Sequence, residues 1–269
     1  METESLDLLQ TTIGFAVGML VGATSTGGGA LLTPALVLIA RVPPSIAIGS
    51  DVLIASGMKL FGGGFYALRR EVHWPTAGRL AIGSIPGAAF GISILNMMSS
   101  EQIEAWLMRA LGLVLLAAGT ALILRLRLAD RFQSTQFPPT PVTVVLGFIT
   151  GILVSMTSVG SGSLLLCILT LVYPLNTRTS VGTDLVHALA LSSAATIGHA
   201  AAGRVDIALV AAVLAGGVPG VLVGARLATS VPERSLRTGL AIVLLMIGFQ
   251  LTLFGVSHDI AAPFGGSAS

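Results

Sequence analysis

Charged side chains are scarce in this chain of 269 residues. They make up 10% of the sequence, against 54% for hydrophobic residues, whereas soluble domains carry about 25% charged residues. With a mean hydropathy of +0.92, this composition excludes an ordinary soluble domain and predicts an integral membrane protein. The net charge of +2 requires no nucleic-acid partner, because it fits lysine and arginine gathered in cytoplasmic loops.

Cysteine is rarer still. The single cysteine, Cys167, excludes an internal disulfide, and we interpret it as a packing residue of its apolar run. The four histidines and this cysteine show no metal-ligand spacing, and no G-x-x-x-x-G-K-[ST] phosphate loop occurs. The sequence therefore predicts no enzyme, no metal and no cofactor. A basic signal-peptide start is also missing, since Glu2, Glu4 and Asp7 make the N-terminus acidic, so the first apolar run is expected to be retained.

Long apolar runs dominate what is present. Six uninterrupted runs are long enough to span a bilayer, which takes about 20 residues. They are Ser45–Leu68, Thr76–Met97, Ala105–Leu124, Ser180–Ala202, Asp206–Thr229 and Leu236–Phe254. A polar, proline-rich linker from Arg125 to Pro141 is expected between the two halves.

Two further apolar runs are interrupted by polar, glycine-rich stretches, here called the first and second break. The first break is Thr24, Ser25, Thr26, Gly27, Gly28 and Gly29, and the second is Thr157, Ser158, Val159, Gly160, Ser161 and Gly162. Glycines and hydroxyls weaken a helix. Such a break survives at membrane depth only where protein covers it or where it lines a cavity. Each break is therefore a candidate binding site.

The two halves of the chain are repeats. Adding 133 to the number of a first-half residue gives its counterpart without a gap, so that Gly49-Ser50-Asp51 falls on Gly182-Thr183-Asp184 and Pro86-Gly87 on Pro219-Gly220. This register predicts a first transmembrane repeat at residues 1–132 and a second at 133–269. Small residues on the later helices of each repeat, such as Gly83 and Gly216, are expected to let neighbouring helices approach closely.

The repeats could be parallel, with each broken run crossing the membrane, or inverted, with each broken run forming a re-entrant hairpin. The arms of the first broken run, about residues 13–23 and 30–40, would each be about 15 Å long as helices, which reaches only mid-bilayer. The inverted arrangement with an outside N-terminus also places Arg69-Arg70, residues 125–131 and residues 233–237 in the cytoplasm. We therefore predict an all-α polytopic membrane protein of two inverted repeats, each a broken re-entrant helical hairpin plus three transmembrane helices.

Facing hairpin tips would form an anion site. The second arm of each hairpin begins a helix whose first N–H groups are unpaired and whose dipole is positive there. Glycine lets a ligand approach this backbone, and hydroxyls add donors. The alternative is that the small residues only permit tight packing. The expected substrate-binding residues are Thr24, Ser25, Thr26, Gly27, Gly28, Gly29, Lys59, Thr157, Ser158, Gly160, Ser161 and Gly162.

Charged residues inside the runs are hypotheses of function. Asp51 and Asp184 are read either as caps, of their own helix N-termini or of the hairpin tips, or as proton- or sodium-coupling groups. Lys59 would contact the substrate or pair with an aspartate. His187 is either a buried hydrogen-bonding histidine or a coupling or gating group. His199, near a run's end, is expected at the interface.

These motifs resemble the TauE/SafE family of sulfite-exporter-like membrane proteins. The resemblance is carried by the two Thr-Ser-x-Gly-x-Gly breaks and by the downstream Gly-Ser/Thr-Asp and Pro-Gly motifs, and it covers residues 11 to 256. It implies transport of small sulfur-containing anions, such as sulfite or organosulfonates.

We therefore expect a secondary transporter of small anions, an exporter in the bacterial inner membrane. It would work by alternating access, with the anion held near the midplane. An anion channel of the same architecture is the alternative. The expected partners are a small anionic substrate and membrane lipid, with no nucleic acid, and a homo-oligomer remains open.

Overall fold

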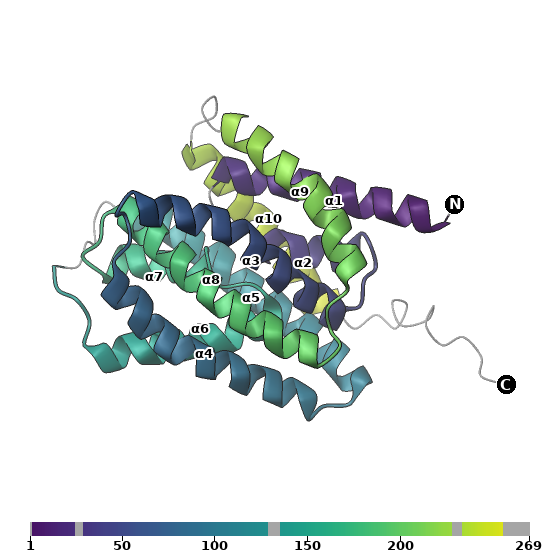
Figure 1. Cartoon of the computed structure of the whole chain (residues 1–269), viewed down its shortest axis with the longest axis horizontal. Coiled ribbons are helices and arrows are strands. Elements are labelled where there is room, and N and C mark those ends of the chain that lie inside the picture. Colours follow the sequence, from purple (N-terminus) through teal and green to yellow (C-terminus); the bar gives the residue numbers. More distant parts are fainter. Residues whose placement is uncertain (1, 25–28, 129–134, 228–232, 255–269) are drawn as a thin grey trace.

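The computed structural model describes residues 2–24, 29–128, 135–227 and 233–254. These residues form helices and no strand, which confirms the all-α prediction (Figure 1). In chain order the helices are α1 (Glu2–Thr24), α2 (Gly29–Leu38), α3 (Pro44–Leu68), α4 (Trp74–Asn96), α5 (Ser100–Leu128), α6 (Thr140–Thr157), α7 (Leu164–Val172), α8 (Thr177–Ala201), α9 (Ile207–Leu227) and α10 (Glu233–Phe254).

The helices that precede the breaks are longer than expected. α1 has 23 residues, so the first arm of about residues 13–23 predicted for the first broken run is too short. α6, which precedes the second break, has 18 residues, whereas α2 and α7 have 10 and 9 residues. In α1 the helix continues into the polar N-terminal residues, and its apolar part is only Leu8–Val21. α6 begins at Thr140 and includes Pro141, which was assigned to the linker, because proline in the first helical positions lacks only an N–H that would be unpaired anyway.

The repeat is visible in the helix boundaries. α3 and α8 each have 25 residues, and every one of their end residues is displaced by 133 positions. The contacts between halves also come in exchanged pairs. A Cβ on Gly14 of α1 would meet the carbonyl of Val213 in α9, and a Cβ on its counterpart Gly147 of α6 would meet the carbonyl of Leu80 in α4. Equivalent glycine contacts therefore recur between the two halves.

Close approach of helix backbones at glycine is confirmed at the predicted positions. A Cβ on Gly83 would meet the carbonyl of Val144, and one on Gly216 would meet the carbonyl of Thr11. These glycines hold α4 against α6 and α9 against α1, as small residues do where membrane helices pack tightly.

α3 and α8 form the centre of the bundle. In Figure 1 they lie side by side, with the α4–α6 pair on one side and the α1–α9 pair on the other. Their directions are opposite. Gly49, near the start of α3, lies on the carbonyl of Arg204 just after α8, and Gly182, near the start of α8, lies on the carbonyl of Glu71 just after α3.

Large apolar side chains cover the outside of the bundle. Ile82 of α4, Leu222 of α9 and Phe249 of α10 are each at least half exposed. Among the described residues, α4, most of α5, α6 and most of α9 are long and apolar enough to cross a membrane. The polar side chains of α3 and α8 point inward instead, since Asp51, Lys59 and their neighbours are buried. The molecule is therefore apolar outside and polar at its centre, as a bilayer requires.

Candidate functional site

The two breaks meet at the centre of the bundle. Gly29, the first residue of α2, lies against Ser158 of the second break. A Cβ added to Gly29 would meet the carbonyl of Ser158 and lie 3.0 Å from its hydroxyl oxygen. Each half thus contributes to one shared region. The predicted site residues Ser25, Thr26, Gly27 and Gly28 lie outside the described residues, as does the side chain of Thr24.

Glycine shapes the second break. α6 ends at Thr157, and Ser158 takes the left-handed conformation with φ of 58°. Gly160 and Gly162 follow with φ of 130° and 90°, values that side chains disfavour and glycine permits. Three residues with positive φ within five positions change the direction of the chain before α7 begins at Leu164.

Lys59 lies beside this break. Its side chain is only 6% exposed, and its ammonium donates to the hydroxyl of Ser161 at 2.8 Å and to that of Ser192 at 3.3 Å. Ser192 is the counterpart of Lys59 in the second repeat. No carboxylate of the described residues forms an ion pair with this ammonium within 4.0 Å. Direct pairing with Asp51, one of the two predicted alternatives, is therefore not what the structure shows.

The two aspartates hold the second arms and not the ends of their own helices. α3 and α8 each begin seven residues before their aspartate, and Asn176 caps α8, so the own-helix N-cap interpretation is wrong. The hydroxyl of Thr33 in α2 donates to Oδ2 of Asp51, and the backbone N–H of Gly162 lies close enough to Asp184 to interact with it. Of the two capping interpretations, capping of the breaks between the helices is the one that agrees with these contacts.

Both aspartates are buried, at 1% and 2% exposure. Oδ1 of each has no hydrogen-bond partner among the described residues, and neither do the hydroxyls of Ser158 and Ser163 at the second break. Lys59 interacts electrostatically with both carboxylates. Buried polar atoms are nearly always paired, so these atoms, which have no partner within the described residues, are candidates to contact a ligand.

Two histidines, His187 and His199, are buried in the structure. Nε2 of His187 lies 2.9 Å from the hydroxyl of Ser84 in α4, as in the hydrogen-bonding alternative. His199, expected at the interface, is 1% exposed, with Nε2 2.7 Å from the carbonyl of Ser155. That expectation is wrong because the last turn of α8 lies against the last turn of α6 instead of facing the membrane surface.

Sequence reasoning missed three polar partners at the centre: Thr33, Ser84 and Ser192. Ser192 was within reach of it, since the displacement of 133 marks it as the counterpart of Lys59. Thr33 and Ser84 carry no such signal, because single hydroxyls in apolar helices commonly bond to their own backbone.

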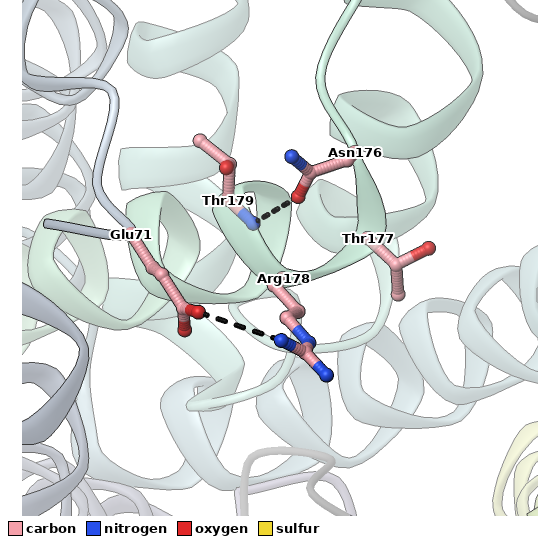
Figure 2. A pocket seen from close by; sticks show the side chains of 5 residues that line it. All are labelled: Glu71, Asn176, Thr177, Arg178 and Thr179. Atoms are coloured by element: carbon pink, nitrogen blue, oxygen red, sulfur yellow. Dashed lines mark hydrogen bonds and ion pairs between the residues drawn. The ribbon is translucent and has the colours of Figure 1, made fainter. Parts of the chain in front are cut away.

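A surface hollow of about 460 Å³ lies elsewhere, where α3 ends and α8 begins. Figure 2 shows its lining residues, which are Glu71, Asn176, Thr177, Arg178 and Thr179. The side chain of Asn176 accepts the N–H of Thr179 at 2.8 Å and so caps α8. Arg178, with its side chain 82% exposed, pairs with Glu71 at 3.9 Å. An exposed pair of this kind is worth about 0–1 kcal/mol, and the hollow shares no residue with the predicted site.

Comparison with known proteins gives consistent matches. The family model described as sulfite exporter TauE/SafE matches residues 11–251. The probable membrane transporter protein YjnA of Bacillus subtilis (strain 168) is 36% identical over 247 residues, which cover 89% of this chain and 97% of the relative. The probable membrane transporter proteins YunE and YdhB of the same organism are 22% and 25% identical and cover 93% and 88% of this chain, and 96% of each relative. No solved structure matches the chain.

Proposed function

This chain belongs to the sulfite exporter TauE/SafE family, and we propose that it exports small sulfur-containing anions, such as sulfite or organosulfonates, across the inner membrane of a bacterium. The chain is an integral membrane protein and a membrane transporter, as its family and its relatives are named, and not an enzyme. The anion would bind where the two breaks meet.

The observation that carries this proposal is the buried ammonium of Lys59. An ammonium has three donors, and serine hydroxyls accept two of them, which leaves one N–H without a partner among the described residues. A buried cation bonded only to neutral oxygens is costly unless an anion joins it. Sulfite or a sulfonate supplies this charge together with several strong acceptor oxygens.

The surrounding groups support an anion at this place. The hydroxyls of Ser158 and Ser163 are buried and have no partner within the described residues. α2 and α7 both begin beside the meeting point of the breaks, so the positive ends of their dipoles lie close to it. The predicted substrate-binding residues remain a proposal, with Ser161, Ser158 and Lys59 as its best-supported members.

Alternating access of two inverted repeats is the proposed mechanism. The opposite directions of the equivalent helices α3 and α8 support it, because equivalent helices of parallel repeats would run the same way. The short second arms support the re-entrant hairpin, since helices of 10 and 9 residues reach about 15 Å, half of a hydrocarbon core of about 30 Å. Both termini would then face outside and the linker between α5 and α6 would face the cytoplasm.

A thermal-shift screen of the purified protein tests the function. The probes are sulfite, sulfate, thiosulfate, taurine and sulfoacetate, with chloride as the control anion. A ligand at 100 times its dissociation constant stabilises the folded protein by about 2.7 kcal/mol. We expect one or more sulfur oxyanions to raise the melting temperature at concentrations where chloride does not. Equal shifts with all anions, or none, would contradict the proposal, and single-channel currents in a planar bilayer would identify a channel instead.

A further inference from the structure

We propose that the two Gly-Ser/Thr-Asp motifs link the anion site to the loops that begin α9 and α4, and that Ser50 and Thr183 are the positioning residues of this link. The proposal rests on the proposed function and deepens it, because it names residues beside the site through which anion binding moves the two halves.

The motifs lie at equivalent places in the two central helices. Gly49-Ser50-Asp51 is in α3 and Gly182-Thr183-Asp184 is in α8, and all six residues are buried. Each motif touches a loop of the other half. Residues 202–206, after α8, lie on the first motif, and residues 69–73, after α3, lie on the second. The two loops are at opposite ends of the α3–α8 pair (Figure 1).

The two loops have the same local structure. Arg70 and its counterpart Gly203 both have positive φ, at 58° and 69°. The N–H groups of the next residues, Glu71 and Arg204, each donate to the carbonyl five positions earlier, at 3.0 and 2.9 Å. A positive φ together with such a bond is a common way to end a helix. The contacts of the two loops with the motifs can therefore be compared residue by residue.

The first two residues of each motif bind the backbone of the loop. A Cβ on the glycine of either motif would meet a loop carbonyl, so glycine lets the loop approach the helix. The hydroxyl of Ser50 accepts the N–H of Asp206 at 3.0 Å. The hydroxyl of Thr183 accepts the N–H of His73, the counterpart of Asp206, at 2.9 Å. The same bond therefore occurs once in each direction between the halves.

The loop residues that these hydroxyls hold are helix caps. Oδ1 of Asp206 accepts the N–H groups of Ala208 and Leu209 at 2.9 and 3.1 Å, and Nδ1 of His73 accepts the N–H of Thr76 at 3.3 Å. Each hydroxyl thus holds the residue at which α9 or α4 begins. α9 packs tightly on α1 and α4 on α6 through glycine contacts, so a shift of the cap moves a pair of helices.

The third residue of each motif faces the site. Asp51 accepts the hydroxyl of Thr33 in α2 and interacts with Ser158 of the second break, while Asp184 interacts with the N–H of Gly162. Adjacent residues of one helix move together, and hydrogen bonds weaken steeply when they are bent. A shift of α2 or of the second break is therefore passed through the aspartate and the neighbouring hydroxyl to a loop of the other half.

Hydrogen–deuterium exchange of the purified wild-type protein, with and without sulfite, tests the link. Peptides that contain residues 69–73 and 202–206 report the N–H groups that the motifs hold. We expect sulfite to change the exchange rate in both loops by about twofold or more, because exchange follows the local opening of these bonds. The turn between α4 and α5 is the control, since the N–H groups of Met97 and Met98 donate to carbonyls of α4. Its exchange should change less.

Two substitutions at one position separate the hydrogen bond from packing. Thr183→Val keeps the shape of the side chain and removes the hydroxyl, whereas Thr183→Ser keeps the hydroxyl and removes a methyl group. We expect Thr183→Val to bind sulfite as the wild type does, to lose the exchange response of residues 69–73, and to lower sulfite turnover in proteoliposomes about 2- to 10-fold. Thr183→Ser should retain both the exchange response and the turnover.

The equivalent hydroxyl provides an independent comparison. Ser50→Ala should lower turnover with unchanged sulfite affinity, and the exchange response of residues 202–206 should be lost. Ser56→Ala is its matched control on α3, because the hydroxyl of Ser56 donates to the carbonyl of Val52 in its own helix. Turnover of this control should stay close to that of the wild type.

The outcomes separate the link from the proposed function. If sulfite neither raises the melting temperature nor changes exchange anywhere, export of sulfite is wrong and the link falls with it. Stabilisation by sulfite with unchanged exchange in both loops overturns the link alone. It is also overturned if Thr183→Ser is impaired and Thr183→Val is not, or if Thr183→Val loses affinity as much as turnover. The wild-type exchange measurement decides even where a variant does not fold.

Discussion

Replacement of Lys59 by methionine tests the centre of the site most directly. Methionine keeps the approximate length of the side chain and removes its charge and its donors. In the empty protein the ammonium donates to Ser161 and Ser192, and no carboxylate of the described residues lies within 4.0 Å of it. The substitution therefore breaks two bonds to neutral hydroxyls and not a contact ion pair.

The magnitude follows from these contacts. Loss of one charge-assisted hydrogen bond to the anion costs about 1.5–3 kcal/mol, which is a rise in the dissociation constant of about 10- to 150-fold. The empty protein loses two serine contacts but no longer buries an ammonium, so these effects oppose each other. Breaking a buried ion pair costs about 3–5 kcal/mol. We expect Lys59→Met to lower the free energy of unfolding by less than this amount.

The assay is anion binding and thermal unfolding of the same detergent preparations. Ser192→Ala is the matched control, because it removes one acceptor and keeps the charge, and it should change affinity only slightly. The double variant Lys59→Ser with Ser192→Lys moves the ammonium from position 59 to the equivalent position 192. It should restore part of the binding that Lys59→Met loses. Full binding in Lys59→Met would refute the role of Lys59. Large destabilisation that Asp51→Asn reverses would show that Lys59 serves as the partner of Asp51.

Three further predictions use other parts of the structure. Ser158→Val should weaken anion binding by about 1.5–3 kcal/mol and leave folding unchanged, and calorimetry measures the affinity. An unchanged affinity would show that the hydroxyl of Ser158 does not contact the anion. Gly83→Ala should destabilise by about 1–3 kcal/mol because its Cβ meets backbone of α6, whereas Gly78→Ala on the same helix, with nothing within 4 Å, should not lower the melting temperature. For topology, Ser134→Cys should resist a membrane-impermeant thiol reagent in intact cells and Ser267→Cys should react; equal labelling of both from outside would contradict the inverted arrangement.

The sequence predicted features that repeat or that depend on local composition. Apolar runs gave the long helices, because a bilayer requires about 20 apolar residues per span. The displacement of 133 gave equivalent helices, and glycine at equivalent positions gave the close contacts of α4 with α6 and of α1 with α9. Each of these features depends on residue type and on spacing along the chain.

Features that depend on tertiary contact were harder to predict. The first arm of the first broken run was expected to cover only apolar residues, yet α1 also includes polar residues between Glu2 and Gln10. α6 likewise includes Pro141, which was assigned to the linker. The partners of Lys59, Asp51 and His187 are set by contacts across the two-fold relation and by helix rotation. Spacing along one helix does not reveal these contacts.

The pairing of Lys59 with Ser192 explains why the two repeats differ at the place where symmetry brings them together. The side chains of these counterparts meet at 3.3 Å. Lysine in both repeats would press two ammonium groups together, which is strongly unfavourable in a low dielectric, and serine in both would leave the site without this cation. One lysine and one serine supply a single positive charge where α3 of the first half and α8 of the second meet. A cation in that position can remain with the anion when either half moves, so the departure from symmetry at residue 59 is consistent with one anion site that both halves share.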